Sequence, residues 1–310
     1  MSTVEKNTSK NFDFEFDSNK SLYADGIVRP SLNYWQDAFR RLKKNKVAIG
    51  AGIILIFIIF MTIFGPSISG HSFTQMNRQM VNKPPSAEHW FGTDRMGRDL
   101  FTRAWVGGRV SIIIGVVGAI VNVVLGLIYG GVSGFFGGRV DTIMMRCIEI
   151  LGSIPKMILI ILISLILKPG IPSLIVALTI AGWIGTARMV RGQVLQLKEM
   201  DFVTASRALG ASPFSIIKEH LVPNVMSTII VLTTIQVPSL MFAEAFLSFI
   251  GLGVSSPNTS WGAMCAEGQQ VILFYPYQLI FPTILISLTM LCFNLLGDGL
   301  RDALDPKLRR

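Results

Sequence analysis

Two charged residues lie inside otherwise apolar segments, and they are the first candidates for chemistry in this chain. Lys156 follows a proline within the apolar stretch 143–167, and Glu244 lies in the phrase FAEAFLSFIGLG. A lone charge at the centre of a bilayer costs about 3 kcal/mol or more, so each charge needs a partner or watery surroundings. We expect Lys156 to line a water-filled pathway or to reach the inner membrane interface. We expect Glu244 to face a cavity between two subunits or to hydrogen-bond across a helix seam.

The chain contains none of the common catalytic motifs. It has no GxxxxGK[ST] phosphate-binding loop, no HExxH and no GxSxG. His89 with Asp94 and Asp99 is one candidate metal set, but these residues are also consistent with a polar external cap, which is the interpretation we favour. The sequence therefore predicts no catalytic residue and no metal site, and the energy for its function must come from another protein.

Residues 200–223, which we call the knuckle, form a polar stretch between two apolar runs and predict two short helices. The first, at 203–209, is expected to end at Gly210 in a left-handed or tightly packed conformation, as glycine often does at helix ends. The second, at 213–221, is expected to start at Ser212-Pro213, because proline is preorganised for a first helical turn. Such an element can dock into a groove on a soluble partner, and an ordinary helix-turn-helix loop is the alternative.

The composition predicts a membrane protein. Hydrophobic residues make up 51% of the 310 residues, charged residues 15%, and the mean hydropathy is +0.54, which is too apolar for a soluble domain. Runs of about 20 apolar residues are long enough to cross a bilayer as helices. Six runs approach this length, at 47–69, 110–136, 143–167, 169–187, 224–243 and 275–297. The expected fold class is an all-α integral membrane protein with six transmembrane helices.

The distribution of positive charge predicts the orientation. The formal net charge is +9, and 20 of the 28 lysines and arginines fall in loops that are cytoplasmic when both termini lie inside. Lysine and arginine are enriched in cytoplasmic loops because they resist translocation. We therefore expect both termini and the knuckle in the cytoplasm. We also expect the basic residues to contact lipid headgroups rather than nucleic acid. No cleavable signal peptide is expected, because the first apolar run begins only after 46 mostly polar residues.

Four segments make up the expected organisation. Residues 1–45 form a cytoplasmic tail, disordered over 1–30, with an interfacial helix near 34–44 whose alternative is an extension of the first span. The other segments are 46–109 with the first transmembrane helix and an external segment, 110–300 with the remaining spans and the knuckle, and the cytoplasmic tail 301–310. A short helix is expected at 98–105 in the external segment.

Glycines recur every four residues in the second apolar run, at Gly126, Gly130, Gly134 and Gly138. This spacing keeps one helix face free of side chains and lets another helix approach closely. We expect a helix seam there, formed either by static packing or by contact with a partner or a moving helix.

Several phrases of the chain resemble one family of membrane proteins. HWFGTDRMGRD at 89–99 is similar to the HxFGTDxxGRD of OppC/DppC-type permeases, which are membrane subunits of ABC importers for oligopeptides and dipeptides. SFIGLGV at 248–254, SWG at 260–262 and GDGLRDALDP at 297–306 resemble the same family in the same order. The resemblance covers nearly the whole chain from about residue 34.

The knuckle resembles the EAA loop of importer-type ABC permeases, where the ATP-hydrolysing subunit grips the membrane subunit. The matching positions are Thr204, Ala205, Ser206, Gly210, Leu221 and Pro223. Thr204 stands where glutamate is usual, and Ser206 replaces the second alanine. The resemblance implies that these positions form an ATPase-coupling loop.

The resemblance also implies a type I importer permease of the MetI-like fold. With a homologous OppB/DppB-like permease, the chain would form a translocation pathway for oligopeptides, with dipeptides or a nickel chelate as alternative substrates. Two cytoplasmic ATPase subunits would bind ATP and Mg²⁺, an extracytoplasmic protein would bind the peptide, and no cofactor is expected in this chain. Lys156 and Glu244 are the candidate pathway residues, although the family usually has a small or neutral residue in place of Lys156. An ion-driven secondary transporter is a more distant alternative, but it would be expected to show internal repeats.

Overall fold

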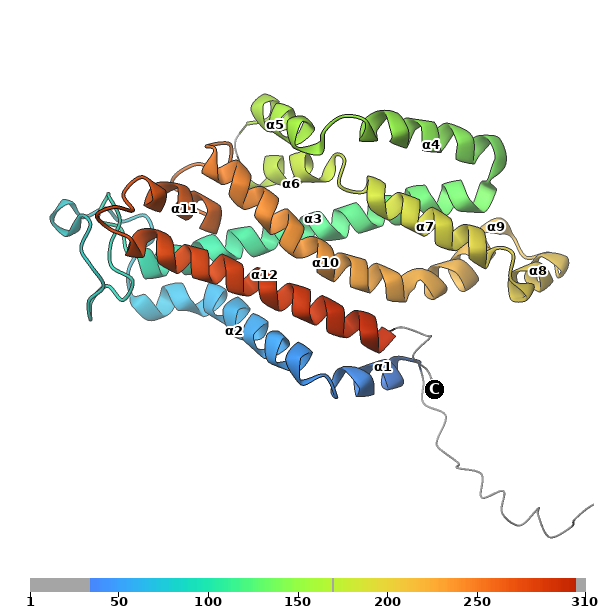
Figure 1. Cartoon of the computed structure of the whole chain (residues 1–310), viewed down its shortest axis with the longest axis horizontal. Helices are drawn as coiled ribbons and strands as arrows, with labels where there is room; N and C mark the ends of the chain where they lie inside the picture. Colours follow the sequence, from blue (N-terminus) through green and yellow to red (C-terminus); the bar gives the residue numbers. More distant parts are fainter. Residues whose placement is uncertain (1–33, 169, 305–310) are drawn as a thin grey trace, which may run out of the picture.

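All regular secondary structure in the computed structural model, which describes residues 34–168 and 170–304, is helical (Figure 1). In chain order the elements are α1 (Tyr34–Leu42), α2 (Lys46–Ser69), the 3-10 helix η2 (Arg78–Met80), α3 (Leu100–Phe136), α4 (Gly138–Gly152), α5 (Lys156–Ile166), α6 (Ile171–Thr179), α7 (Ile184–Leu197), α8 (Asp201–Ala208), α9 (Pro213–Ile216), the π-helical turn η3 (Ile217–Leu221), α10 (Val222–Phe249), α11 (Trp261–Gln269) and α12 (Tyr277–Leu304). The disordered tail expected at 1–30 and the end of the expected tail 301–310 lie outside the described residues.

Four stretches of helix are long and apolar enough to cross a membrane, namely α2, α3, α12 and the continuous run Pro213–Phe249. Two pairs, α4 with α5 and α6 with α7, pass the same test together but bend by 79° and 48° at short breaks. The described chain therefore has four candidate spans, or six if each bent pair is one span. The all-α membrane fold is confirmed, and the count of six spans stays a prediction.

Helix α3 is longer than the sequence pattern indicated, because it joins the short helix expected at 98–105 to the apolar run at 110–136. Asp99 caps it, since its carboxylate accepts a hydrogen bond from Thr102 N at 2.7 Å. Gly108 does not interrupt the helix but lets it lie directly against the Trp261 ring. The domain boundary expected between residues 109 and 110 thus falls inside a continuous helix.

The third expected span, 143–167, is broken near its middle. Residues 153–155 separate α4 from α5, and the chain bends by 79° there. Pro155 accounts for the break, because proline disfavours helical geometry in the preceding residue and cannot donate the next helical hydrogen bond. Lys156 is consequently the first residue of α5.

Helix α1 is separate from α2 and is not its plain extension. The chain turns between them, and Asn45 Oδ1 accepts a hydrogen bond from Ala48 N at 3.1 Å, which caps α2. α1 packs beside the last turns of α12, so the first and last described helices lie together (Figure 1). Because α12 continues to Leu304, residues 301–304 belong to a helix and not to the expected tail.

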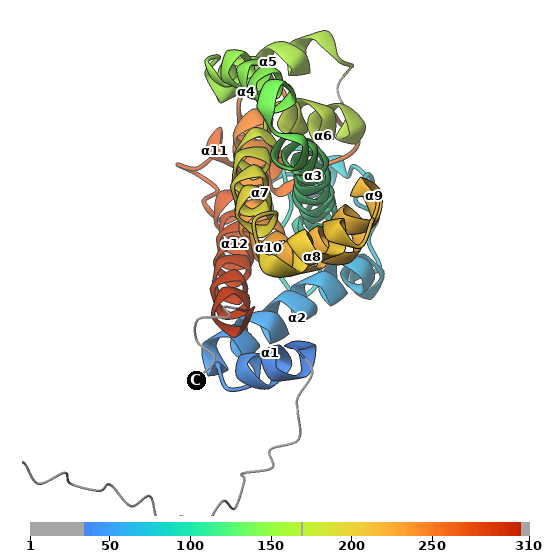
Figure 2. The same cartoon turned by 90° about the vertical axis from the view of Figure 1, so that its right-hand side faces the viewer.

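Helix α3 is the centre of the bundle and packs against α2, α7 and α10 (Figures 1 and 2). Its seam with α7 uses Gly126, Gly130 and Gly134. A Cβ on Gly130 would lie 2.2 Å from the carbonyl oxygen of Ala187, so only glycine permits this approach. A Cβ on Gly138 would meet nothing within 4 Å, and this residue begins α4 instead. The glycine seam therefore joins two helices of the same chain.

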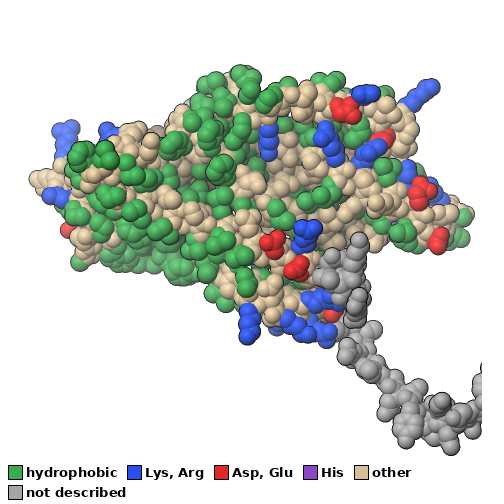
Figure 3. All heavy atoms as spheres, in the orientation of Figure 1, with side chains coloured by type: hydrophobic (Ala, Val, Ile, Leu, Met, Phe, Trp, Pro, Cys, Tyr) green, Lys and Arg blue, Asp and Glu red, His purple; other side chains and the backbone are tan. Residues whose placement is uncertain are grey.

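The bundle has two different ends. The knuckle end carries α8 and α9, and the cap end carries the segment 71–99 and α11 (Figure 1). Apolar side chains cover much of the surface between them, while Lys and Arg side chains gather toward the ends (Figure 3). On α2 the exposed apolar residues include Ile53, Ile56 and Phe57, which suits a face turned to lipid or to another chain.

Candidate functional site

The first half of the knuckle ends in a Schellman turn. α8 is followed by Gly210 with φ +82°, a left-handed conformation that glycine adopts without strain. The Gly210 N–H donates to Arg207 O at 2.9 Å. The Ala211 N–H donates to Ser206 O at 3.1 Å, which satisfies a second carbonyl of the helix end. The left-handed glycine is confirmed, but a Cβ there would meet nothing within 4 Å, so conformation rather than packing requires glycine.

The second half of the knuckle begins at Ser212 and Pro213 as expected, and the Ser212 hydroxyl caps α9. It then passes through η3 into α10 without a break. Pro223 lies in the first turn of α10, and the wider π-helical turn before it accommodates the missing N–H. The Asn224 side chain donates a hydrogen bond from Nδ2 to the His220 carbonyl oxygen at 2.6 Å in this turn.

A small apolar core fixes the knuckle to the bundle. Val203 of α8 and both Ile216 and Leu221 of the second half are at most 2% exposed. They pack with Val190 and Val194 of α7. Fully burying an aliphatic side chain of this size contributes about 2 kcal/mol. The knuckle is therefore packed on α7, which in turn contacts α3 along the glycine seam.

The outer face of the knuckle exposes two large apolar side chains, Leu209 at 89% and Phe214 at 73%. We call these two residues the knuckle tip. The two residues flank the turn 210–213 in the sequence, and large apolar side chains with this much exposure are typical of contact sites. The tip is therefore a candidate docking surface.

The six positions of the coupling motif fall into two groups. Leu221 is buried in the core of the knuckle and Ser206 is half-buried. The other four are exposed and can touch a partner, and these are Thr204, Ala205, Gly210 and Pro223.

The two charges inside apolar segments lie in different surroundings. Lys156 is exposed on the surface of the described chain at the start of α5. Glu244 of α10 is fully buried, and its carboxylate accepts hydrogen bonds from Ser111 of α3 at 2.9 Å and from Ser248 at 2.7 Å. Glu244 thus makes hydrogen bonds across a helix seam, while a role for either residue in a pathway stays a prediction.

Charged residues form a network at the cap end, in which Asp94, Arg98 and Arg103 are buried and the Glu267 side chain is 43% exposed. The Asp94 carboxylate accepts hydrogen bonds from Arg98 Nε at 2.6 Å and from Arg103. Glu267 of α11 accepts hydrogen bonds from the same two arginines, at 3.2 and 3.0 Å. Burial raises the pKa of the Glu267 carboxyl, and the charge of Arg98 opposes that shift. The network ties the segment before α3 to α11.

This network corrects the metal set considered from the sequence. Two arginines occupy the carboxylate of Asp94, so His89, Asp94 and Asp99 do not converge. His89 Nδ1 lies 2.9 Å from Asp99 Oδ1 instead, and His71 brings a third ligand atom within 4.8 Å of both residues. The three residues line a pocket of about 180 Å³ at the cap end.

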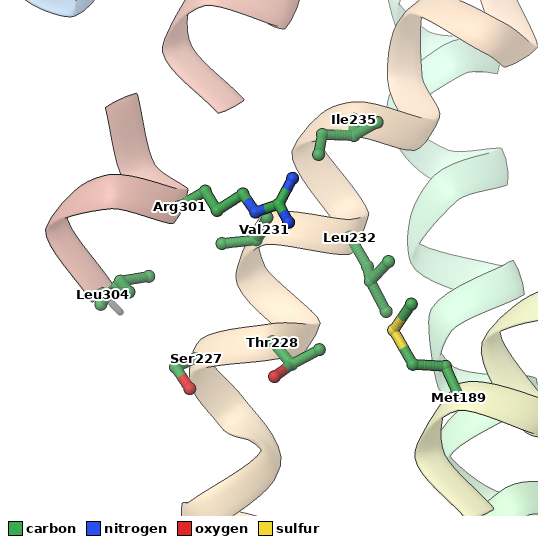
Figure 4. Close-up of a pocket in the computed structure, with 8 residues that line it drawn as sticks. All are labelled: Met189, Ser227, Thr228, Val231, Leu232, Ile235, Arg301 and Leu304. Atoms are coloured by element: carbon green, nitrogen blue, oxygen red, sulfur yellow. The ribbon is translucent and has the colours of Figure 1, made fainter. Parts of the chain in front are cut away.

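A second pocket, of about 410 Å³, lies between α7, α10 and α12 (Figure 4). Its lining residues are Met189, Ser227, Thr228, Val231, Leu232, Ile235, Arg301 and Leu304. Arg301 extends from α12 toward α10, with its guanidinium between the levels of Val231 and Ile235 (Figure 4). The pocket thus offers one cation and two hydroxyl groups in an apolar lining, which suits a ligand with both apolar and anionic groups.

The sequence did not indicate His71 or Arg301 as site residues, because their neighbours are set by how distant loops and helices pack. His71 is far from His89 in the sequence, and only the fold of the segment between them brings the rings together. Arg301 was assigned to a polar tail. A signal that could have found it is the repeat of Leu296, Leu300 and Leu304 every four residues, which continues the apolar pattern of α12 through this segment.

Two family models match the chain. The model for the binding-protein-dependent transport system inner membrane component matches residues 95–310, which is well over half of the chain. The model for the N-terminal TM domain of oligopeptide transport permease C matches residues 33–85.

Relatives of similar length match along almost the whole chain. The dipeptide transport system permease protein DppC of Bacillus subtilis is 52% identical over 298 residues, covering 96% of this chain and 93% of the relative. The oligopeptide transport system permease protein OppC of the same organism is 49% identical, covering 93% and 94%. The OppC protein of Escherichia coli strain K12 is 43% identical, covering 89% and 92%.

A solved structure shares the fold. A chain of the inward-facing MetNI methionine ABC transporter superposes with a TM-score of 0.53 at 22% identity, covering 64% of this chain and 94% of that chain. At this identity the likeness concerns the fold alone, and it confirms the MetI-like fold expected from the sequence.

Proposed function

This chain belongs to the family of binding-protein-dependent transport system inner membrane components, and from this premise we propose that it is one of two permease subunits through which an ABC importer moves oligopeptides. ABC importers work with separate ATPase and substrate-binding proteins. We infer that this chain binds neither ATP nor Mg²⁺ itself and catalyses no reaction. The relatives named for oligopeptide and dipeptide transport support peptides as the cargo, with dipeptides as the second candidate.

The observation that carries the proposal is the construction of the knuckle. Its tip, Leu209 and Phe214, is exposed, whereas its inner side is packed on α7. A soluble ATPase that binds the tip would move α7 with it, and the glycine seam would carry that movement to α3. The coupling itself requires that the ATPases contact the knuckle differently in two nucleotide states.

We propose that the knuckle end faces the cytoplasm and the cap end faces outward. The cluster of Lys and Arg around α1, at positions 40–46 beside the first span, supports this orientation, because such residues resist translocation. The ATPases would then meet the knuckle tip, and an extracytoplasmic peptide-binding protein would meet the cap end.

The pathway would form against a homologous permease of the OppB/DppB type. The pocket between α7, α10 and α12 borders helix faces that the rest of the described chain leaves uncovered. A second permease facing it would close the pocket into a passage. Arg301 could then attract the carboxylate of a peptide, and Ser227 and Thr228 could hydrogen-bond its backbone.

The test compares two aspartate substitutions of exposed phenylalanines in the complex of both permeases with both ATPases. Phe214→Asp places a charge on the knuckle tip, and Phe274→Asp places one at the opposite end, on a side chain that is 80% exposed. We expect Phe214→Asp to lose the ATPase subunits on purification, or to lose peptide-stimulated hydrolysis, while Phe274→Asp retains the ATPases. Normal retention and normal stimulated hydrolysis in Phe214→Asp would contradict the proposed docking.

A further inference from the structure

The histidine pair at the cap end is not explained by transport. His71 lies in the loop after α2, and His89 lies in the segment before α3. Their ring centroids are 4.6 Å apart with an angle of 31° between the rings. His89 and Asp99 are nearly buried, with 8% and 2% of their side chains exposed. Two imidazoles and a carboxylate at this separation form a common ligand set for a divalent transition metal.

The hydrogen bonds of the two rings fix which nitrogen is available. His71 Nε2 lies 3.1 Å from the Glu88 carbonyl oxygen, which can only accept, so Nε2 carries the proton. His89 Nδ1 lies 2.9 Å from the Asp99 carboxylate, so Nδ1 carries the proton there. In the neutral rings, His71 Nδ1 and His89 Nε2 retain their lone pairs, and neither makes a hydrogen bond within the described residues.

This is the arrangement that orients histidines toward a metal, because a ligating imidazole usually donates its other N–H to a carbonyl or carboxylate oxygen. Asp99 is itself held in place, since its second oxygen accepts from the Thr102 N–H and hydroxyl at 2.7 Å each. One ring nitrogen of each histidine and a carboxylate oxygen of Asp99 lie within 4.8 Å of one another. Tetrahedral zinc ligands are about 3.3 Å apart, so the half-exposed His71 must move toward His89 for both rings to bind one ion.

We propose that His71 and His89, with Asp99 as the group that orients His89, bind a Zn²⁺ ion at the cap end. The pocket of about 180 Å³ beside them gives the ion access to solvent and leaves room for water as a further ligand. The bound ion joins the loop after α2 to the segment before α3. The ion therefore stabilises the folded cap, because a ligand that binds only the folded state shifts the folding equilibrium toward that state.

The chain supplies its own matched control, since it has three histidines and the third, His220, lies in the knuckle. The full chain in complex with its partners is purified with a tag that lacks histidine, and bound zinc is measured after dialysis against buffered Zn²⁺. His71→Gln is the test variant, because its amide can still donate to the Glu88 carbonyl. His89→Gln is the second variant, and Asp99 is left unchanged because it caps α3.

We expect one Zn²⁺ more per complex in the parent and in His220→Gln than in His71→Gln and His89→Gln. Zinc affinity at this site should fall at least about tenfold in His71→Gln. Co²⁺ should give the visible absorption of a four-coordinate ion in the parent and in His220→Gln but in neither of the other two variants. Zn²⁺ should raise the thermal unfolding midpoint of the parent but not that of His71→Gln. Equal zinc content in the parent and in His71→Gln, or an equal loss in His220→Gln, overturns the proposal.

Discussion

The glycine seam between α3 and α7 permits a sharp test, because two adjacent glycines differ completely in their surroundings. A Cβ on Gly130 would lie 2.2 Å from Ala187 O and 3.0 Å from Arg191 N, both backbone atoms of α7. A Cβ on Gly131 would meet nothing within 4 Å. Alanine at the first position therefore forces two helices apart, and alanine at the second does not.

The expected magnitudes follow from two opposing effects. Replacing glycine by alanine in a helix favours folding by about 1 kcal/mol at either position. Overpacking costs about 1–3 kcal/mol, and the clash at Gly130 belongs at the upper end because backbone atoms cannot rotate away. Gly130→Ala should therefore be less stable than Gly131→Ala by about 3 kcal/mol. Displacing α7 also moves Val190 and Val194, on which the knuckle packs, so coupling to the ATPases should weaken.

The assay is thermal unfolding of the purified complex in detergent, with peptide-stimulated ATP hydrolysis measured on the same preparations. Gly131→Ala should unfold at or above the parent midpoint and hydrolyse ATP normally. Gly130→Ala should unfold clearly lower and lose stimulation. Indistinguishable midpoints for the two variants would refute the close approach of α3 and α7.

Three further substitutions test other parts of the fold. Gly210→Val should lower the free energy of unfolding by about 1–2 kcal/mol, because valine is strained in the left-handed backbone conformation, and should reduce peptide-stimulated hydrolysis. Gly192→Ala, at an open position on α7, is the control. Normal peptide-stimulated hydrolysis in Gly210→Val would contradict the role of the Schellman turn. Asp94→Asn should lower stability by about 3 kcal/mol, because it leaves Arg98 and Arg103 buried without that carboxylate. The exposed ion pair of Arg146 with Glu149 is the control, and Glu149→Gln should lower stability by less than about 1 kcal/mol. Equal unfolding midpoints for Asp94→Asn and Glu149→Gln would contradict the stabilising role of the Asp94 network. Lys156→Met should change the transport rate or peptide preference while the complex still assembles, and unchanged transport across a peptide panel would assign Lys156 to the membrane interface.

The sequence predicted those features that depend on neighbouring residues. Gly210 and the Ser212-Pro213 start of α9 were predictable because the backbone preferences of glycine, serine and proline act over one or two turns. The apolar runs were predictable because the thickness of a bilayer sets their length. The boundaries of α3 and the break at Pro155 were harder, since propensity does not tell whether a glycine or proline will be tolerated by its packing partners.

The candidate sites that the sequence did not predict depend on contacts between distant segments. The pairing of Asp94 with Arg103 removes that carboxylate from any metal set, and it requires the turn before α3 to fold back on that helix. The approach of His71 to His89 depends on the loop after α2. The pocket at Arg301 requires α12 to extend past the end of its apolar run and to lie beside α10.

The central claim is that this chain is a permease whose transport is driven by ATP hydrolysed in other subunits. Its most direct test is the uptake of a labelled oligopeptide into proteoliposomes that contain this chain, a homologous permease and the two ATPases, with the binding protein outside and ATP enclosed. We predict uptake that requires ATP, the binding protein and an unaltered knuckle tip, and that stops when ADP replaces ATP. Uptake driven by a proton or sodium gradient without ATP would contradict the account.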